Sequence, residues 1–130
     1  NMFPTFIQKQ LLGHLTTAVL VLKEDLTVVY LNSSAEMLFE VSGQRLKDSH
    51  IEQLLHESNA PLTGLEECIK TGQSFTEREV ELYTLKGDRI NVDYTVKLVP
   101  DKKNVYLVME VNARDRLQRI SREEGLLAKQ

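Results

Sequence analysis

The sequence of 130 residues contains one cysteine, no tryptophan and only three prolines. A single cysteine, Cys68, excludes an internal disulfide and is typical of a reducing compartment. With aromatic residues at 6%, the chain offers little for stacking a large planar cofactor. The longest apolar run, residues 18–22, is far shorter than the roughly 20 residues that span a bilayer. The sequence therefore argues against a disulfide scaffold and against a membrane-spanning protein.

The charge balance lacks a basic excess, since the formal net charge is -3. A chain of this charge has no positive field to hold nucleic acid or an anionic membrane surface. The first ten residues lack the charged start and continuous apolar segment of a signal peptide, so we expect a cytoplasmic protein. The length and the 42% of hydrophobic residues predict one domain with a real core.

The first two thirds of the chain predict a hairpin followed by helices. Residues 17–22 and 27–31 are rich in β-branched side chains and are joined by a polar turn. Asn32, Ser33 and Ser34 are helix N-cap types, and the short helix after them is expected to end at Gly43. A second short helical segment contains Ile51, Leu54 and Leu55, and a longer helix spans residues 61–71.

The last third predicts three strands, at residues 74–85, 89–99 and 105–111. Apolar and polar side chains alternate along them, which indicates an antiparallel sheet with one buried face. Glu77, Glu79 and Glu81 also alternate, and we expect them to share the solvated face. Helices on one face of a five-stranded antiparallel sheet give an α+β fold.

Two flanking helices are predicted outside this sheet domain. Residues 3–15 carry an apolar stripe at four-residue spacing, and the charged segment 113–130 carries a short heptad pattern with Glu124 at one core position. We therefore divide the chain into a domain at residues 1–112 and a C-terminal helix at residues 113–130. The two helices predict a homodimer whose candidate interface residues are Phe3, Ile7, Leu11, Leu117, Ile120 and Leu127.

Candidate catalytic and metal-binding residues are few. The segment from His56, HESNAPLTGL, resembles a phosphoacceptor box of sensor kinases, but it also reads as a helix end followed by a proline-initiated helix. We favour the second interpretation, because the sequence has no glycine-rich phosphate loop. His14 and His50 are isolated, so no metal site is predicted. Acid–base roles for Asp25, Asp88 and Asp93 have no supporting motif.

The strand–Asn–short helix–Gly–short helix run, with a hairpin before it and three strands after it, resembles a PAS sensor domain. Four segments resemble the nitrogen-regulation sensor histidine kinases of the NtrB type: residues 12–22, 30–32, 70–80 and 115–123. The resemblance implies a sensor fragment without catalysis of its own. In the parent protein, it implies a cytoplasmic dimeric kinase that phosphorylates a transcription activator and is regulated by the PII signal protein.

The resemblance also bears on cofactors and leaves alternatives open. Haem-binding PAS domains use a histidine on the long helix, and flavin-binding ones use a cysteine motif that Cys68 does not match. No cofactor and no metal is therefore expected, and Cys68 is interpreted as a small core residue. A PAS domain that binds a small metabolite in its cavity is the first alternative. A small enzyme is the second.

Overall fold

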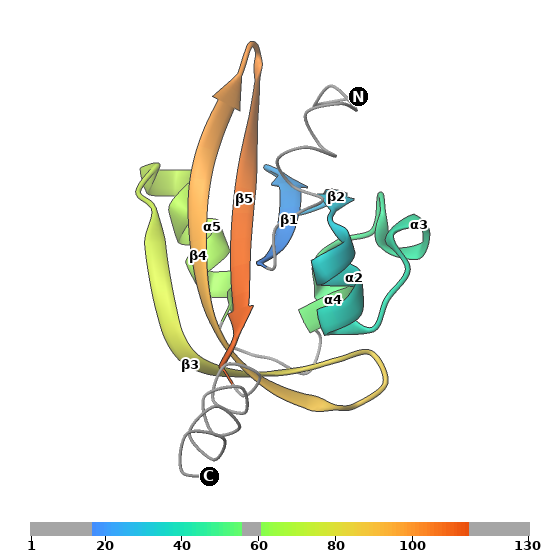
Figure 1. Cartoon of the computed structure of the whole chain (residues 1–130). Coiled ribbons are helices and arrows are strands. Elements are labelled where there is room, and N and C mark those ends of the chain that lie inside the picture. The colour runs from blue at the N-terminus through green and yellow to red at the C-terminus, as the bar shows by residue number, and fades with distance from the viewer. Residues whose placement is uncertain (1–16, 56–60, 115–130) are drawn as a thin grey trace, which may run out of the picture.

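The computed structural model describes residues 17–55 and 61–114. It contains β1 (Ala18–Lys23), β2 (Val28–Leu31), α2 (Ser33–Phe39), α3 (Gly43–Leu46), α4 (Glu52–Leu55), α5 (Pro61–Thr71), β3 (Phe75–Tyr83), β4 (Arg89–Asp101) and β5 (Asn104–Ala113). The strands form one antiparallel sheet in the order β2-β1-β5-β4-β3 (Figure 1). The predicted α+β fold with five antiparallel strands is confirmed. The two flanking helices that were predicted lie outside the described residues.

One face of the sheet, here called the inner face, carries the core. Its alternate strand residues form a single apolar cluster with buried side chains of α2, α3, α4 and α5. The largest fully buried members include Leu20, Leu22, Phe39, Leu54, Leu65 and Leu107. Burying one such side chain stabilises a fold by about 1.5–3 kcal/mol, so this cluster dominates the stability of the domain. Within the described ranges, no helix is long and apolar enough to cross a bilayer.

Asn32 connects the first hairpin to α2. Its side-chain Oδ1 accepts hydrogen bonds from the Ala35 amide at 2.9 Å and from the Val19 amide at 3.0 Å. Its Nδ2 donates to the Thr17 carbonyl at 3.0 Å. The side chain is buried and serves as the N-cap of α2 while it also extends the pairing of β1. The predicted capping role is confirmed.

The prediction that Gly43 ends the first short helix is wrong. The chain leaves α2 at Glu40, which adopts the left-handed conformation with φ 56°, and Gly43 is the first residue of α3. Glu36 Oε2 accepts the Gly43 amide at 2.6 Å, and a Cβ at Gly43 would lie 3.1 Å from that oxygen. The glycine is therefore used for a close approach rather than for a positive φ. Glu40 is stabilised by a residue far away in the sequence, because its carboxylate accepts a hydrogen bond from the buried Thr84 hydroxyl at 3.3 Å.

Candidate functional site

The face of the sheet opposite the core, here called the outer face, carries a charged cluster near the end of β5. Asp93 lies on this face because it alternates along β4 with Val92 and Tyr94, which are both buried in the core. Its side chain is 26% exposed. Asp93 is therefore a partly screened carboxylate at the middle of a central strand.

A β-bulge in β3 gives Asp93 its first partner. Glu77 pairs with Tyr94 and Val80 pairs with Val92, so Arg78 and Glu79 together stand opposite Asp93. Glu79 has φ 56°, which a residue with a Cβ rarely adopts. Its amide donates to Asp93 Oδ1 at 2.9 Å. The Asp93 carboxylate thus accepts a hydrogen bond from the Glu79 amide, which the bulge removes from the regular hydrogen bonding between β3 and β4.

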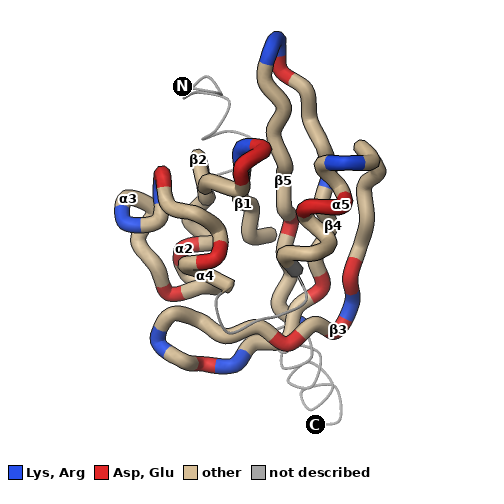
Figure 2. Tube along the Cα trace, turned by 180° about the vertical axis from the view of Figure 1, so that it is seen from behind, with Lys and Arg blue, Asp and Glu red and all other residues tan. Residues whose placement is uncertain are grey.

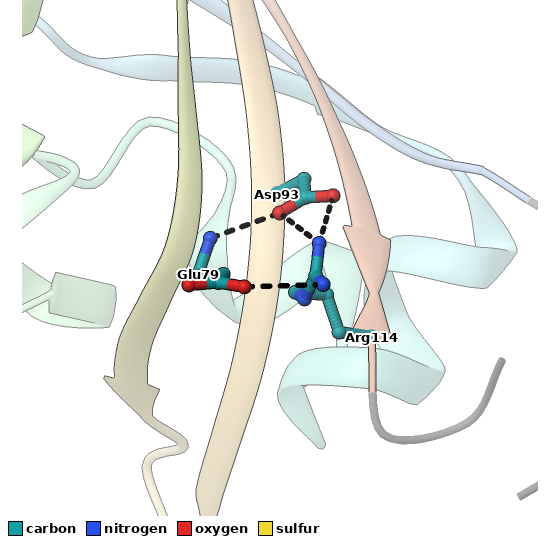
Figure 3. Close-up of polar contacts among 3 residues, drawn as sticks. All are labelled: Glu79, Asp93 and Arg114. Carbon is teal, nitrogen blue, oxygen red and sulfur yellow. Dashed lines mark hydrogen bonds and ion pairs between the residues drawn. The ribbon is translucent and has the colours of Figure 1, made fainter. Parts of the chain in front are cut away.

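Arg114 gives Asp93 its second partner. It is the first residue after β5 and has helical backbone conformation. Its Nη1 donates to both carboxylate oxygens of Asp93, at 2.9 and 3.1 Å, and its Nη2 lies 3.3 Å from Glu79 Oε1 (Figure 3). The cluster of Glu79, Asp93 and Arg114, here called the junction cluster, therefore joins β3, β4 and the start of the C-terminal segment.

The electrostatics of the junction cluster favour the ionised carboxylate. The Glu79 amide is the strongest influence that lowers the pKa of Asp93; partial burial opposes it, and the Arg114 guanidinium lowers the pKa further. A charge-assisted contact of this kind is stronger and more directional than a neutral hydrogen bond. These charge-assisted contacts are suited to holding β3, β4 and the start of the C-terminal segment in a fixed arrangement. Both carboxylates of the junction cluster are engaged with the Arg114 guanidinium.

The bulge also corrects the expectation that Glu77, Glu79 and Glu81 share one face. All three are exposed, but Glu77 stands opposite the inward-facing Tyr94, whereas Glu81 stands opposite Asn91 on the outer face. The extra residue at the bulge reverses the alternation between them. Burial, and secondarily the charge of Glu77, raise the pKa of Tyr94 to about 12.

Tyr94 is the buried phenol of the core, at 2% exposure. Its ring meets Phe75 edge to face, with centroids 6.0 Å apart. Within the part of the chain that the structure describes, no hydrogen bond to its hydroxyl is found. Buried hydroxyls in proteins usually have a hydrogen-bond partner, so the Tyr94 hydroxyl is a polar group placed inside an otherwise apolar core.

The other sequence candidates are separate from the junction cluster. Cys68 is 1% exposed in the core, which confirms its interpretation as a core residue. Asp25 accepts the Thr27 amide within the first turn, and His50 Nδ1 accepts the Glu52 amide at 3.1 Å. No group of metal-binding side chains occurs among the described residues. The structure does not describe His14, His56 or the interface candidates Phe3, Ile7, Leu11, Leu117, Ile120 and Leu127.

Sequence reasoning missed the junction cluster. The alternation of β4 did place Asp93 on the polar face, which was the available signal. The bulge at Glu79 could not be read from residues 75–83, because the glutamates at 77, 79 and 81 alternate there without a break. Arg114 is 21 residues from Asp93 along the chain, and only the pairing of β4 with β5 brings them together.

Known proteins resemble this chain in sequence and in fold. A family model described as the PAS fold matches residues 7–116. The sensory histidine kinase/phosphatase NtrB of Vibrio alginolyticus is 29% identical over 126 residues, which are 97% of this chain and 36% of that protein. The protein of the same name from Klebsiella oxytoca is 28% identical over 115 residues, or 88% of this chain and 32% of that protein. The chain thus spans about a third of the length of these curated relatives.

Solved structures show the same arrangement of strands and helices. The PAS domain of nitrogen regulation protein NR(II) from Vibrio parahaemolyticus superposes with a TM-score of 0.74 and 26% identity, covering 82% of this chain and 97% of that one. A PAS domain from a two-component sensor histidine kinase superposes with a TM-score of 0.68 at 14% identity, covering 84% of this chain and 95% of that one. The second likeness shows the fold alone.

Proposed function

Since the chain belongs to the PAS fold family, we propose that it is the regulatory sensor module of a cytoplasmic two-component histidine kinase for nitrogen regulation. In this proposal the module has no catalytic step of its own. It relays a signal to a kinase core that follows the helix at residues 113–130. The similarity to NtrB kinases over 97% of the chain supports the assignment to this type of kinase.

The observation that carries the relay is the position of Arg114. This residue stands where β5 gives way to the C-terminal segment, and its guanidinium is bound by two strands of the sheet. A shift between β3 and β4 would change the geometry of both acidic partners at once. The direction in which the C-terminal segment leaves the sheet therefore depends on the state of the sheet.

The proposal includes a homodimer and two partners. Dimerisation is assigned to the flanking helices through Phe3, Ile7, Leu11, Leu117, Ile120 and Leu127, whose apolar spacing supports it. The resemblance to nitrogen-regulation kinases supports a response-regulator transcription activator and the PII signal protein as partners of the full-length kinase. The division into a domain at residues 1–112 and a signalling helix at residues 113–130 belongs to the same proposal.

The relay is tested with Arg114→Gln in the full-length kinase. The substitution keeps a polar side chain but shortens it, and it removes the charge that joins Asp93 to Glu79. We expect the basal autophosphorylation rate to persist and the response to the regulatory signal to fall at least several-fold. Arg89→Gln is the matched control, because Arg89 is exposed and its guanidinium lies 3.7 Å from Glu81, outside the junction cluster. An equal regulatory response in Arg114→Gln, Arg89→Gln and the unaltered kinase would refute the relay.

A second candidate function is a PAS domain that senses a small metabolite in its interior. The buried hydroxyl of Tyr94 favours it, because this group could hydrogen-bond a ligand with an acceptor and an otherwise apolar body inside the apolar core. Native mass spectrometry of freshly purified protein tests this candidate, because dimer mass and bound ligand are read in the same spectrum. A ligand-free spectrum that is the same for Tyr94→Phe and the unaltered chain would rule against it.

A further inference from the structure

β3 carries one more residue than β4 between two rows that the core holds in place. Phe75 pairs with Val96, and Val80 pairs with Val92, and all four side chains lie in the core or pack against it. Between these rows, the four residues 76–79, here called the bulge segment, stand opposite three residues of β4. One extra residue must lie within the bulge segment, since without it Val80 would turn away from the core.

Apolar packing fixes both ends of the bulge segment. At one end the Phe75 ring lies against α5, where a Cβ on Gly64 would come within 2.8 Å of Phe75 Cζ. The same ring meets Tyr94 edge to face. At the other end Leu82 is 2% exposed, and Val80 packs against the core cluster. The core therefore determines how many residues the bulge segment contains, but it does not determine where the extra one stands.

The side chains of the bulge segment give no apolar preference for one position. All four are exposed, and acidic and basic residues follow one another along this edge of the sheet (Figure 2). β3 is an edge strand, so it is paired with β4 alone. The extra residue has three possible positions, opposite Asp93, Tyr94 or Thr95, and burial does not select among them.

Polar contacts select the position opposite Asp93. The Asp93 carboxylate accepts the Glu79 amide at 2.9 Å, and the Arg114 guanidinium contacts the carboxylates of both residues (Figure 3). The hydroxyls of Thr76 and Thr95 lie 3.0 Å apart, which supports the adjoining row. The backbone of Glu79 opposes this arrangement, because its φ of 56° is costly for a residue with a Cβ. The observed position therefore depends on polar contacts that offset local strain.

We propose that the β3 bulge is a movable element whose position is set by the Asp93 side chain. The extra residue stands opposite Asp93 while that side chain accepts the Glu79 amide. When this hydrogen bond is released, the extra residue moves one row toward the start of β3. Glu79 then pairs directly with Asp93 in extended conformation, and Glu77 and Arg78 together stand opposite Tyr94. The paired rows at both ends of the bulge segment stay as they are.

The movement would change what Arg114 contacts. In the structure, Glu79 reaches Arg114 from the bulge, with Oε1 at 3.3 Å from Nη2. After the movement the Glu79 carboxylate would stand directly opposite that of Asp93, where like charges repel, and Arg78 would leave the outer face. The position of the bulge and the placement of the Arg114 side chain are therefore coupled, and a change in either one biases the other.

NMR spectroscopy of the isotope-labelled full chain measures the position of the bulge. In the unaltered protein, the Cα and Cβ shifts of Glu79 should be those of a left-handed residue. Asp93→Ala removes the hydrogen-bond acceptor and leaves both anchoring rows intact. In this variant the Glu79 shifts should become those of extended backbone, and a backbone NOE between residues 78 and 94 should appear.

Two matched variants separate the acceptor from other effects. Asp93→Asn retains an oxygen that can accept the Glu79 amide, so the left-handed shifts of Glu79 should persist. Lys97→Ala removes a charged side chain from the same strand beyond the last row that β3 forms, where Lys97 lies 3.8 Å from Glu110. The Glu79 shifts should also be unchanged in that variant.

A left-handed Glu79 in Asp93→Ala would overturn the inference. Loss of the cross-strand NOEs at Phe75 or Val80 would also overturn it, because the strand would then fray instead of shifting. Extended Glu79 shifts in Asp93→Asn would count against it too, since the acceptor would not set the position. If Asp93→Ala does not fold, relaxation dispersion of the unaltered chain decides: exchange at the amides of residues 77–79 supports the inference, and its absence refutes it.

The regulatory meaning of the movable bulge rests on the proposed relay, whereas its movement is measured without a kinase. The two can therefore fail separately. A regulatory response that is lost in the Arg114→Gln kinase, together with a bulge that does not move, would leave the relay standing and refute this inference. A bulge that moves, together with unchanged regulation in Arg114→Gln, would support this inference and refute the relay.

Discussion

At the scale of single residues, Asp93 connects the β-bulge of β3 to Arg114 at the end of β5. It caps the unpaired amide of the Glu79 bulge and binds Arg114 through both oxygens. Bulges leave a residue out of the ladder and increase the local twist, so they are sensitive to the loss of a supporting bond. One carboxylate therefore controls the shape of an edge strand and the start of the next segment.

The lowered pKa of Asp93 predicts a specific dependence of stability on pH. A carboxyl whose folded pKa lies below its ordinary value of about 3.9 stabilises the fold above that value. This contribution disappears as the pH falls through the lowered folded pKa. Asp93→Asn should be less stable than the unaltered chain at pH 7, and the difference should shrink as the solution becomes more acidic than pH 4.

Urea unfolding midpoints at neutral and acidic pH measure this prediction. Asp25→Asn is a useful comparison, because the pKa of Asp25 is also lowered, chiefly by its side-chain hydrogen bond with Thr27, yet Asp25 contacts no residue of the junction cluster. Only Asp93→Asn should also alter the environment of Arg114. A difference between Asp93→Asn and the unaltered chain that stays constant from pH 7 to strongly acidic solution would show that Asp93 is not stabilised as the anion.

At the scale of elements, the alternation of apolar and polar side chains allowed the strands and their buried faces to be predicted. The runs around Val92, Tyr94 and Val96 predicted β4 and its buried face, because only a period of two fits them. α3 and the end of α2 could not be foreseen, because Glu40 takes a left-handed conformation usually given to glycine. The Glu40 carboxylate accepts a hydrogen bond from Thr84, which is 44 residues away in the sequence. A contact over such a separation cannot be predicted from the residues around Glu40.

The same limit applies to the candidate site. The polar face of β4 could be predicted, so Asp93 was correctly placed as an outward residue. The junction cluster needed the register of three strands, and register depends on the bulge at Glu79. Sequence patterns identify which face a residue occupies, whereas contacts between strands depend on how the strands are aligned.

The capping of α2 by Asn32 gives a prediction at this scale. Asn32→Ala should lower the free energy of unfolding by about 2–4 kcal/mol, because it removes a helix cap and leaves the buried Val19 amide without its acceptor. Ser33→Ala, at the exposed neighbouring position, should change stability by less than about 0.5 kcal/mol. Urea unfolding at neutral pH measures both. Equal effects would mean that the cap and the strand bond contribute little.

At the scale of the whole molecule, the two faces of the sheet have different roles. The inner face and the helices bury the core, and the outer face carries the junction cluster. An arrangement of this kind lets a domain keep its core unchanged while its outer face responds to a partner or a neighbouring copy. The chain is best understood as a sheet whose outer face is connected through Arg114 to the start of the C-terminal segment.

The central proposal is that the helix predicted at residues 113–130 transmits the state of the sheet through its rotational phase. Residues 113–130 carry a heptad pattern, and each helical residue turns the chain by about 100°. One residue inserted after Arg122 would move Leu127 away from the apolar seam, whereas seven residues would return it to nearly the same face.

The most direct test is the regulated autophosphorylation of the full-length kinase carrying either insertion. We predict that the one-residue insertion abolishes or locks the response to the regulatory signal, and that the seven-residue insertion retains it. Equal regulation in the two proteins would contradict the account, because the segment after Arg114 would then act only as a tether.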